Sequence, residues 1–180
     1  MKDKWYIYNT AIMKTKASET IKTIAFNGVL AAMYTIITIV CTPFAYGPIQ
    51  FRVSEILVLL CFFNKRYSIG LIIGCFLANL NSPTMTLDIL FGTAATAIAC
   101  VGIMFSPRLA IAVLFPIVAN AFIVGWELTY FGEPFWFSVG WVALGETVVL
   151  VAGYIFFFLL RKNETFYRLI DAKQNINFKW

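Results

Sequence analysis

Long stretches of apolar residues, broken by very few charges, constrain the fold of this chain more than any other feature. Hydrophobic residues make up 61% of its 180 residues and charged residues only 13%, whereas soluble domains average roughly 45–50% and about 25%. Inside a bilayer no water can satisfy the backbone, and a helix pairs its own N–H and C=O groups. The sequence therefore predicts an all-α membrane protein that forms one helical bundle.

Six apolar segments are candidates for membrane crossing. A helix needs about 20 residues for a full crossing, and the second and third segments are shorter than that. Pro116 interrupts the fifth segment, and the sixth is the longest and most apolar. The six segments are residues 24–41, 53–63, 68–80, 87–105, 109–130 and 137–160.

The positive charges decide how these segments cross. All but one of the 14 Lys and Arg residues lie before the first segment, between the second and third, between the fourth and fifth, or after the sixth. Cytoplasmic loops carry the excess of Lys and Arg, so we predict six transmembrane helices with both termini in the cytoplasm. The expected organisation is a leader at 1–23 (with Met1 or Met13 as the start), a membrane domain at 24–160 and a basic tail at 161–180.

With this topology, most of the ionisable groups within the apolar segments collect in the outer half of the membrane. Charge inside a bilayer is costly and is retained mainly where it faces a cavity, a pathway or a ligand. We therefore predict a polar cup that opens to the exterior. The candidate residues are Arg52, Glu55, Asn79, Asp88, Asn120, Trp126, Glu127, Tyr130, Trp141 and Glu146.

Several of these residues also have structural interpretations. Arg52 and Glu55 are one helical turn apart and fit an interfacial ion pair, and Asp88 fits a helix cap. Asn79 and Asn120 fit interhelical hydrogen bonds. Glu127 and Glu146 have no neighbouring cation in the sequence, which favours a ligand role. Carboxylates beside aromatic rings suit a flat, donor-rich heteroaromatic ligand or an ammonium group.

Other classes of function find little support. The chain has no His and no CxxC pair among its four Cys residues, so we predict no metal site and no cofactor. It lacks a phosphate-binding Gly-rich loop, so it is not expected to hydrolyse ATP or to act as an enzyme. The basic ends are explained by topology and do not indicate a nucleic-acid partner.

Small residues on the first segment suggest a helix contact. Gly28 and Ala32 are four residues apart, with Ala25 and Ala31 beside them. This spacing lets another helix approach closely. The residues favour internal packing and docking of a partner about equally.

Five runs of sequence resemble the QueT family. They are GPIQFRVSE at 47–55, FLANL at 76–80, LDILFG at 87–92, NAFIVGWEL at 120–128 and GE at 145–146. QueT proteins are substrate-binding S-components of energy-coupling factor (ECF) transporters associated with queuosine precursors. The resemblance spans about residues 25–160, and its most specific run is the first, which adds Gln50 to the candidate substrate-binding residues.

The resemblance implies a bundle of the ECF S-component type in the bacterial cytoplasmic membrane. Such a protein captures its substrate outside and docks on a module of one scaffold membrane subunit and two ATPases. The resemblance also implies a 7-deazaguanine ligand, most simply preQ1 (7-aminomethyl-7-deazaguanine), and a docking surface at Gly28 and Ala32. The alternatives are preQ0, another purine-like vitamin, or a stand-alone secondary transporter.

Overall fold

The computed structural model describes residues 2–42, 51–170 and 172, with side chains described from residue 17 onward. Every regular element in these ranges is helical. The main helices are α1 (Lys2–Val40), α4 (Ser68–Asn79), α5 (Met85–Phe105), α7 (Leu114–Thr129) and α8 (Phe135–Leu159). Shorter elements are η1 (Val53–Leu59), α3 (Leu60–Phe63), η2 (Lys65–Tyr67), α6 (Leu109–Ala112), η3 (Leu160–Lys162) and α9 (Glu164–Leu169).

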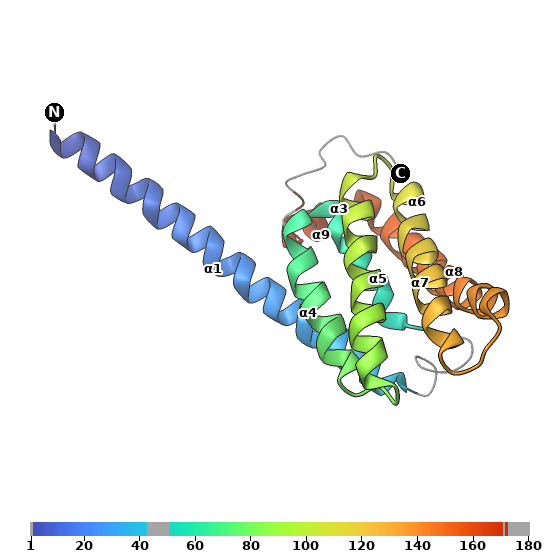
Figure 1. The fold of residues 1–180 in the computed structure, drawn as a ribbon. Coiled ribbons are helices and arrows are strands. Elements are labelled where there is room, and N and C mark those ends of the chain that lie inside the picture. The colour runs from blue at the N-terminus through green and yellow to red at the C-terminus, as the bar shows by residue number, and fades with distance from the viewer. Residues whose placement is uncertain (1, 43–50, 171, 173–180) are drawn as a thin grey trace.

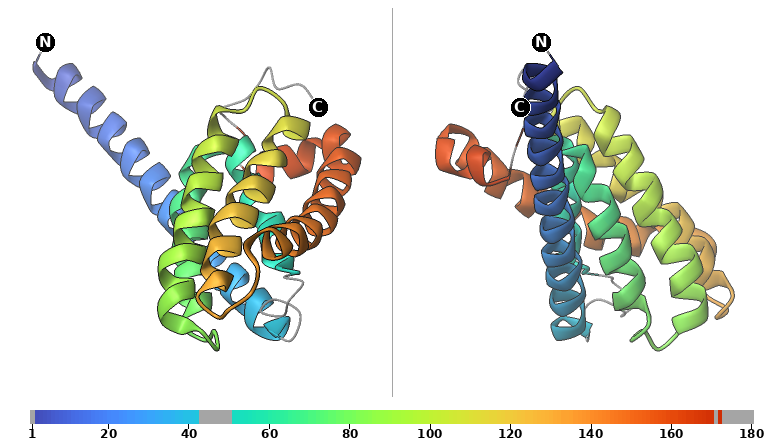
Figure 2. Two further views of the ribbon diagram at one scale, coloured as in Figure 1. Left: turned by 45° about the vertical axis from the view of Figure 1, so that its right-hand side comes forward. Right: turned by 90° about the vertical axis from the view of Figure 1, so that its left-hand side faces the viewer.

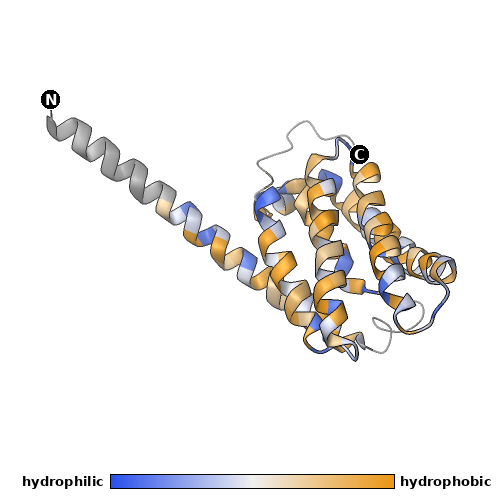
Figure 3. Ribbon diagram, viewed as in Figure 1, coloured by the Kyte–Doolittle hydropathy of each residue, from blue (hydrophilic) through white to orange (hydrophobic). Residues whose placement is uncertain are grey.

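The helices pack as a ring. Successive contacts join α1 to α4, α4 to α5, α5 to α7 and α7 to α8, and η1 closes the ring between α8 and α1. Figures 1 and 2 show the N-terminal part of α1 projecting beyond the other helices. Figure 3 shows hydrophobic residues over most of the bundle, as the composition predicts.

Four helical stretches are long and apolar enough to cross a membrane. They are Ala17–Val40, Met85–Phe105, Leu109–Thr129 and Phe135–Lys162. The Val53–Phe63 stretch is shorter, and α4 has only 12 residues. The chain is thus an all-helical, multi-pass membrane protein, while six crossings and the orientation of the termini stay predictions.

Local sequence explains where several helices begin and end. The fifth predicted segment breaks at Val113, between α6 and α7. Pro116 lacks an N–H group and its ring would clash with the carbonyl of Ala112 in an unbroken helix. In the observed arrangement Pro116 lies in the first turn of α7, where N–H groups have no helical partner. Pro134 similarly precedes the first residue of α8.

The second predicted segment is helical but mostly in the tighter 3-10 form. It comprises η1 and α3, and its side chains at Val58, Leu59, Cys61, Phe62 and Phe63 are all almost completely buried. Neighbouring helices therefore surround this short stretch. Because Arg52 and Glu55 lie at its start, they are carried into the interior of the ring.

Candidate functional site

The buried polar cluster begins with an ion pair between η1 and α5. Arg52 Nη2 lies 3.1 Å from Asp88 Oδ1, and both side chains are almost fully buried. The second carboxylate oxygen of Asp88 accepts hydrogen bonds from the hydroxyls of Ser82 and Thr84. Asp88 was predicted as a possible helix cap, and the structure gives its carboxylate hydroxyl and guanidinium partners. Its charge is therefore matched within the protein.

A glycine on α5 makes room for this ion pair. A Cβ atom at Gly92 would lie 3.1 Å from Arg52 Nη1 and 3.0 Å from Asn79 Nδ2. Asn79 donates from Nδ2 to the backbone oxygen of Asp88 at 2.8 Å, which is the interhelical hydrogen bond that the sequence suggested. The absence of a side chain at residue 92 thus lets two polar groups lie against the helix.

Glu55 connects η1 to the two helices on either side of it. Its Oε1 accepts a hydrogen bond from the hydroxyl of Tyr34 on α1 and another from Thr96 Oγ1 on α5 at 3.3 Å. Next to it, the hydroxyls of Thr38 and Ser54 are 2.7 Å apart. Tyr34 and Thr96 are not among the residues that the sequence predicts for the site. The only signal for them is a hydroxyl inside an apolar segment; a Thr hydroxyl often bonds its own helix backbone there, and a single Tyr fits ordinary packing.

Two further acids enter the cluster from α7 and α8. Glu127 is 2% exposed and Glu146 is 1% exposed. Glu127 interacts electrostatically with Asp88 and Arg52. Glu146 interacts with Glu55 and Arg52, and its carboxyl lies beside the side chain of Asn120. Four carboxyl groups and one guanidinium from four elements therefore form one buried cluster.

Several buried polar atoms of this cluster lack a hydrogen-bond partner within the part of the chain that the structure describes. They are Oε2 of Glu55, Oε2 of Glu127, Oε2 of Glu146, and both Nδ2 and Oδ1 of Asn120. Buried polar groups are almost always paired, because an unpaired group loses its bonds to water without replacement. This concentration of carboxylate oxygens and one amide is suited to a ligand that carries N–H donors and a carbonyl.

The predicted aromatic residues lie outside this cluster. Trp126 is 57% exposed and Tyr130 is 62% exposed. Trp126 contacts Phe135 edge-on, and the half-buried Trp141 contacts Phe137 in the same way. Gln50 lies outside the described residues. A substrate role for these four residues therefore stays a prediction, and the described structure adds no contact between them and the acids.

The small residues of α1 divide between two faces. Ala25, Gly28 and Ala32 are exposed, and a Cβ atom at Gly28 would meet nothing within 4 Å. Ala31 is buried, and a Cβ atom at Gly74 of α4 would lie 2.9 Å from its backbone oxygen. Internal packing thus uses Ala31, while three of the four residues face outward.

The part of the chain that contains this cluster matches a known family of transporters. The model of the family described as "QueT transporter" matches residues 24–162, which include every residue of the cluster. The chain belongs to the QueT family. A curated relative from Lactococcus lactis subsp. cremoris, "Queuosine precursor transporter QueT", is 34% identical over 159 residues, covering 78% of this chain and 91% of the relative. No solved structure matches the chain.

Proposed function

We propose that this chain is the substrate-capture component of an ECF-type importer and that it binds a queuosine precursor at the buried acidic cluster. The set of unpaired carboxylate and amide atoms at Glu55, Asn120, Glu127 and Glu146 carries this proposal. Membership of the QueT family supports a transporter, and the name of the curated relative supports the class of substrate. Energy comes from separate ATPase subunits, because the chain has no nucleotide-binding loop.

A 7-deazaguanine has the donors and the acceptor that this set of atoms requires. Its N1–H and 2-amino groups present two parallel N–H bonds, which one carboxylate accepts in a bidentate pair. Its ring carbonyl accepts a hydrogen bond of the kind that Asn120 Nδ2 donates. We assign the guanine edge to Glu127 or Glu146, because Asp88 already has three partners.

The aminomethyl group of preQ1 makes it the preferred ligand. Arg52 forms its ion pair with Asp88, so Glu55, Glu127 and Glu146 form an acidic excess around any bound molecule. A ligand with an ammonium group offsets this excess, and charge-assisted hydrogen bonds are about twice as strong as neutral ones. The nitrile of preQ0 lacks both the charge and the donors.

The membrane topology that we propose has six crossings with both termini in the cytoplasm. The burial of every residue from Val58 to Phe63 supports it, since a short stretch that other helices shield from lipid has no need of 20 residues. In this arrangement Arg52 and Asp88 lie at the outer ends of their segments. The ligand therefore enters from the outside.

We also propose that α1 docks on the scaffold subunit of the ATP-driven module. One exposed face of α1 carries only small side chains, so another helix can approach it closely. Its residues are Ala25, Gly28 and Ala32. Ala31 is left out of this surface because it packs inside the bundle.

Native mass spectrometry of the purified chain tests the proposed function. We expect a 7-deazaguanine adduct that is carried through purification or forms on adding preQ1. We also expect co-purification with ATPase subunits from the native membrane. A stand-alone transporter predicts uptake by proteoliposomes that contain this chain alone, and that result would contradict the proposal.

A further inference from the structure

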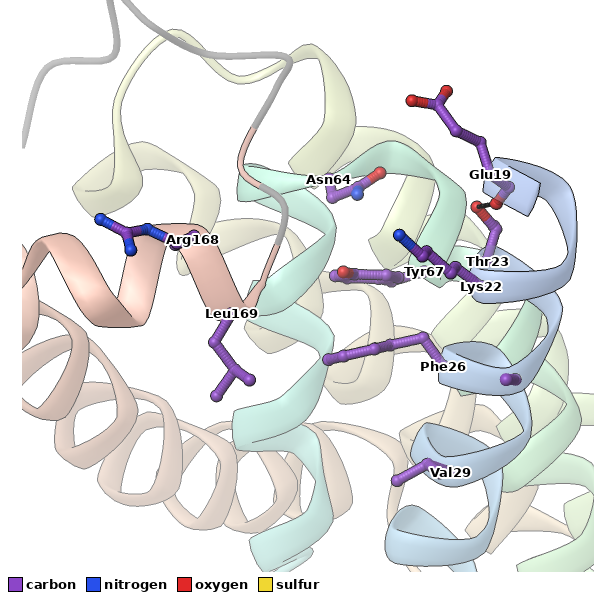
Figure 4. A pocket seen from close by; sticks show the side chains of 10 residues that line it. Glu19, Lys22, Thr23, Phe26, Val29, Asn64, Tyr67, Arg168 and Leu169 are labelled. Atoms are coloured by element: carbon purple, nitrogen blue, oxygen red, sulfur yellow. Dashed lines mark hydrogen bonds between the residues drawn. The ribbon is translucent and has the colours of Figure 1, made fainter. Parts of the chain in front are cut away.

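A groove that shares no lining residue with the acidic cluster lies between α1 and α9. It encloses about 500 Å³ and is lined from α1 by Lys22, Phe26 and Val29, and from α9 by Arg168 and Leu169. Figure 4 shows Lys22 and Phe26 extending from α1 toward Tyr67. A volume of this size holds a small molecule or a lipid headgroup with its first methylene groups.

The bottom of the groove is formed by aromatic side chains that are held in place by ring stacking and a hydrogen bond. The rings of Phe26 and Tyr67 stack with their centroids 5.0 Å apart, and the Tyr67 hydroxyl donates to the backbone oxygen of Ile170 at 2.8 Å. The latter bond attaches the end of α9 to the bundle. Asn163 begins α9 by accepting a hydrogen bond from the Phe166 N–H at 3.0 Å. These contacts fix the position of α9 against the bundle and therefore define the shape of the groove.

The rim of the groove is basic. Lys22 and Arg168 both line it, and neither has an ion-pair partner in the part of the chain that the structure describes. Glu19 is the one acid among the lining residues. Two nearby cations are engaged elsewhere, since Lys65 lies over the Phe105 ring and Arg161 lies over the Phe158 ring. Figure 4 shows the Arg168 guanidinium directed away from Lys22, so an anion beside Lys22 engages both cations once the exposed Arg168 side chain rotates toward it.

The position of the groove indicates where this anion comes from. Lys22 lies near the start of the apolar stretch Ala17–Val40, and α9 follows directly after the stretch Phe135–Lys162. Both ends face the cytoplasm in the topology that we propose. Val29, which lines the groove, is exposed and continues it into the apolar outer surface of α1. The groove is therefore amphipathic, with its charged rim at the membrane surface and its apolar side toward the lipid chains.

We propose that this groove binds one anionic glycerophospholipid of the inner leaflet. The phosphodiester lies between Lys22 and Arg168, and the first part of an acyl chain lies along Phe26 and Val29. Basic pockets between helices at the cytoplasmic side are suited to such headgroups. The proposal depends on the orientation of the chain but not on the ligand of the acidic cluster.

Lipid titration of the full-length chain tests this site. Dioleoyl phosphatidylglycerol is added to the detergent-purified protein, with dioleoyl phosphatidylcholine as the neutral probe, and bound lipid is counted by native mass spectrometry. One phosphatidylglycerol should bind more tightly than the rest and survive delipidation. The double variant Lys22→Gln/Arg168→Gln should bind it about 30-fold more weakly, because each cation near a membrane surface contributes roughly 1 kcal/mol, or about fivefold.

Arg66→Gln/Lys162→Gln is the matched control. Both residues are exposed cations outside the groove, and this variant removes the same net charge. Its tight lipid site should persist. If both double variants lost the same affinity for phosphatidylglycerol, the effect would come from net charge alone and the proposal would be overturned. Equally tight binding of phosphatidylcholine would also overturn it. Circular dichroism and a thermal unfolding scan that match those of the parent show that both double variants are folded.

Crosslinking identifies the occupant in the native membrane. A photoreactive residue at Leu169, which lines the groove and is exposed, should recover phospholipid adducts from cells that hold the complete transporter. Recovery of a protein subunit in their place would mean that the groove is a protein-docking surface and would overturn the lipid assignment.

Discussion

The carboxylates of the buried cluster differ in how many ion-pair and hydrogen-bond partners the protein itself provides for them. Asp88 is paired with Arg52 and two hydroxyls, whereas Oε2 of Glu127 and Oε2 of Glu146 lack partners in the described part of the chain. A fully matched carboxylate holds the site together, and an unmatched one is available to a ligand. We therefore propose that Asp88 belongs to the scaffold and that Glu127 and Glu146 recognise the ligand.

Replacing either glutamate should weaken ligand binding strongly. Glu127→Gln and Glu146→Gln preserve shape and one acceptor but remove the charge, and loss of a buried charge-assisted pair costs roughly 2–5 kcal/mol, or about 30-fold to several thousand-fold in affinity. Titration calorimetry with preQ1 measures this loss. Glu133→Gln, at an exposed position, is the control and should bind like the parent. If both variants stayed within about twofold of the parent, the glutamates would be structural.

Gly92 is predicted to be required for the stability of the cluster. Gly92→Ala places a methyl group 3.0–3.1 Å from Asn79 Nδ2 and Arg52 Nη1, so these groups must move. Overpacking of this kind typically costs about 1–3 kcal/mol, which a thermal unfolding scan detects. Gly140→Ala on α8, where a Cβ atom meets nothing within 4 Å, is the control. It should be neutral or stabilising by up to about 1 kcal/mol; an equally neutral Gly92→Ala would contradict the close packing.

At this scale the sequence identifies the charged residues but not their partners. Helical spacing in the sequence predicts that Arg52 lies beside Glu55, and the place of Asp88 at the start of a segment predicts a helix cap. The observed ion pair joins residues 36 positions apart, and such a contact depends on how η1 and α5 pack. Tyr34 and Thr96 escaped notice for the same reason, because a single hydroxyl in an apolar segment carries no pattern.

At the scale of elements, α1 serves two surfaces. One face carries Tyr34 and Thr38, which bond to Glu55 and Ser54 of η1. Another face carries Ala25, Gly28 and Ala32, which remain exposed. Because this helix contacts both the candidate site and the proposed partner, docking on the partner can change the contacts around the ligand.

Bulky residues on the exposed face of α1 should stop transport without stopping capture. Gly28→Leu and Ala32→Leu are expected to abolish uptake of queuosine precursor in cells, because a partner helix can no longer approach closely. The affinity of the purified variants for preQ1 should stay within about twofold of the parent. Gly140→Leu, at an exposed helical glycine of α8, is the control for added bulk. Loss of ligand binding in the α1 variants would assign these residues to internal packing.

The lengths of α4, α5 and α8 could be predicted well from the sequence, whereas α1 begins at Lys2 and not near residue 24. A polar helix that continues beyond an apolar segment has no hydropathy signal, and the finer form of the elements has none either. Hydropathy alone gives α5 and α8 to within two residues at their starts, and Pro116 correctly indicates an interruption. The 3-10 form of η1 has no hydropathy signal, since it depends on how tightly the neighbouring helices enclose it. Trp126 also shows the limit of the pattern: it adjoins Glu127 in sequence, but adjacent residues of a helix point about 100° apart.

At the scale of the whole molecule, the bundle encloses charge within an apolar ring. Four helical stretches have the length and hydropathy of membrane spans, and the shorter η1, α3 and α4 pack among them. The central question at this scale is orientation, since it determines which end of the ring receives the ligand.

Cysteine labelling in intact cells should confirm the proposed orientation. In a Cys41→Ser background, single cysteines at Asn81 and Glu133 should react with a membrane-impermeant maleimide, while cysteines at Arg66 and Arg108 should react only after permeabilisation. The three other native cysteines are buried and should contribute little signal. Labelling at Arg108 from outside would contradict six crossings with cytoplasmic termini.

The most direct test of the whole account is a calorimetric titration of the purified chain, without any ATPase subunit, with preQ1 and with preQ0. We predict saturable binding of one preQ1 per chain, and binding of preQ0 that is weaker by at least about tenfold, since it lacks the ammonium group that offsets the acidic excess. A folded, monodisperse chain that binds neither compound would contradict the assignment of the acidic cluster as the site of a queuosine precursor.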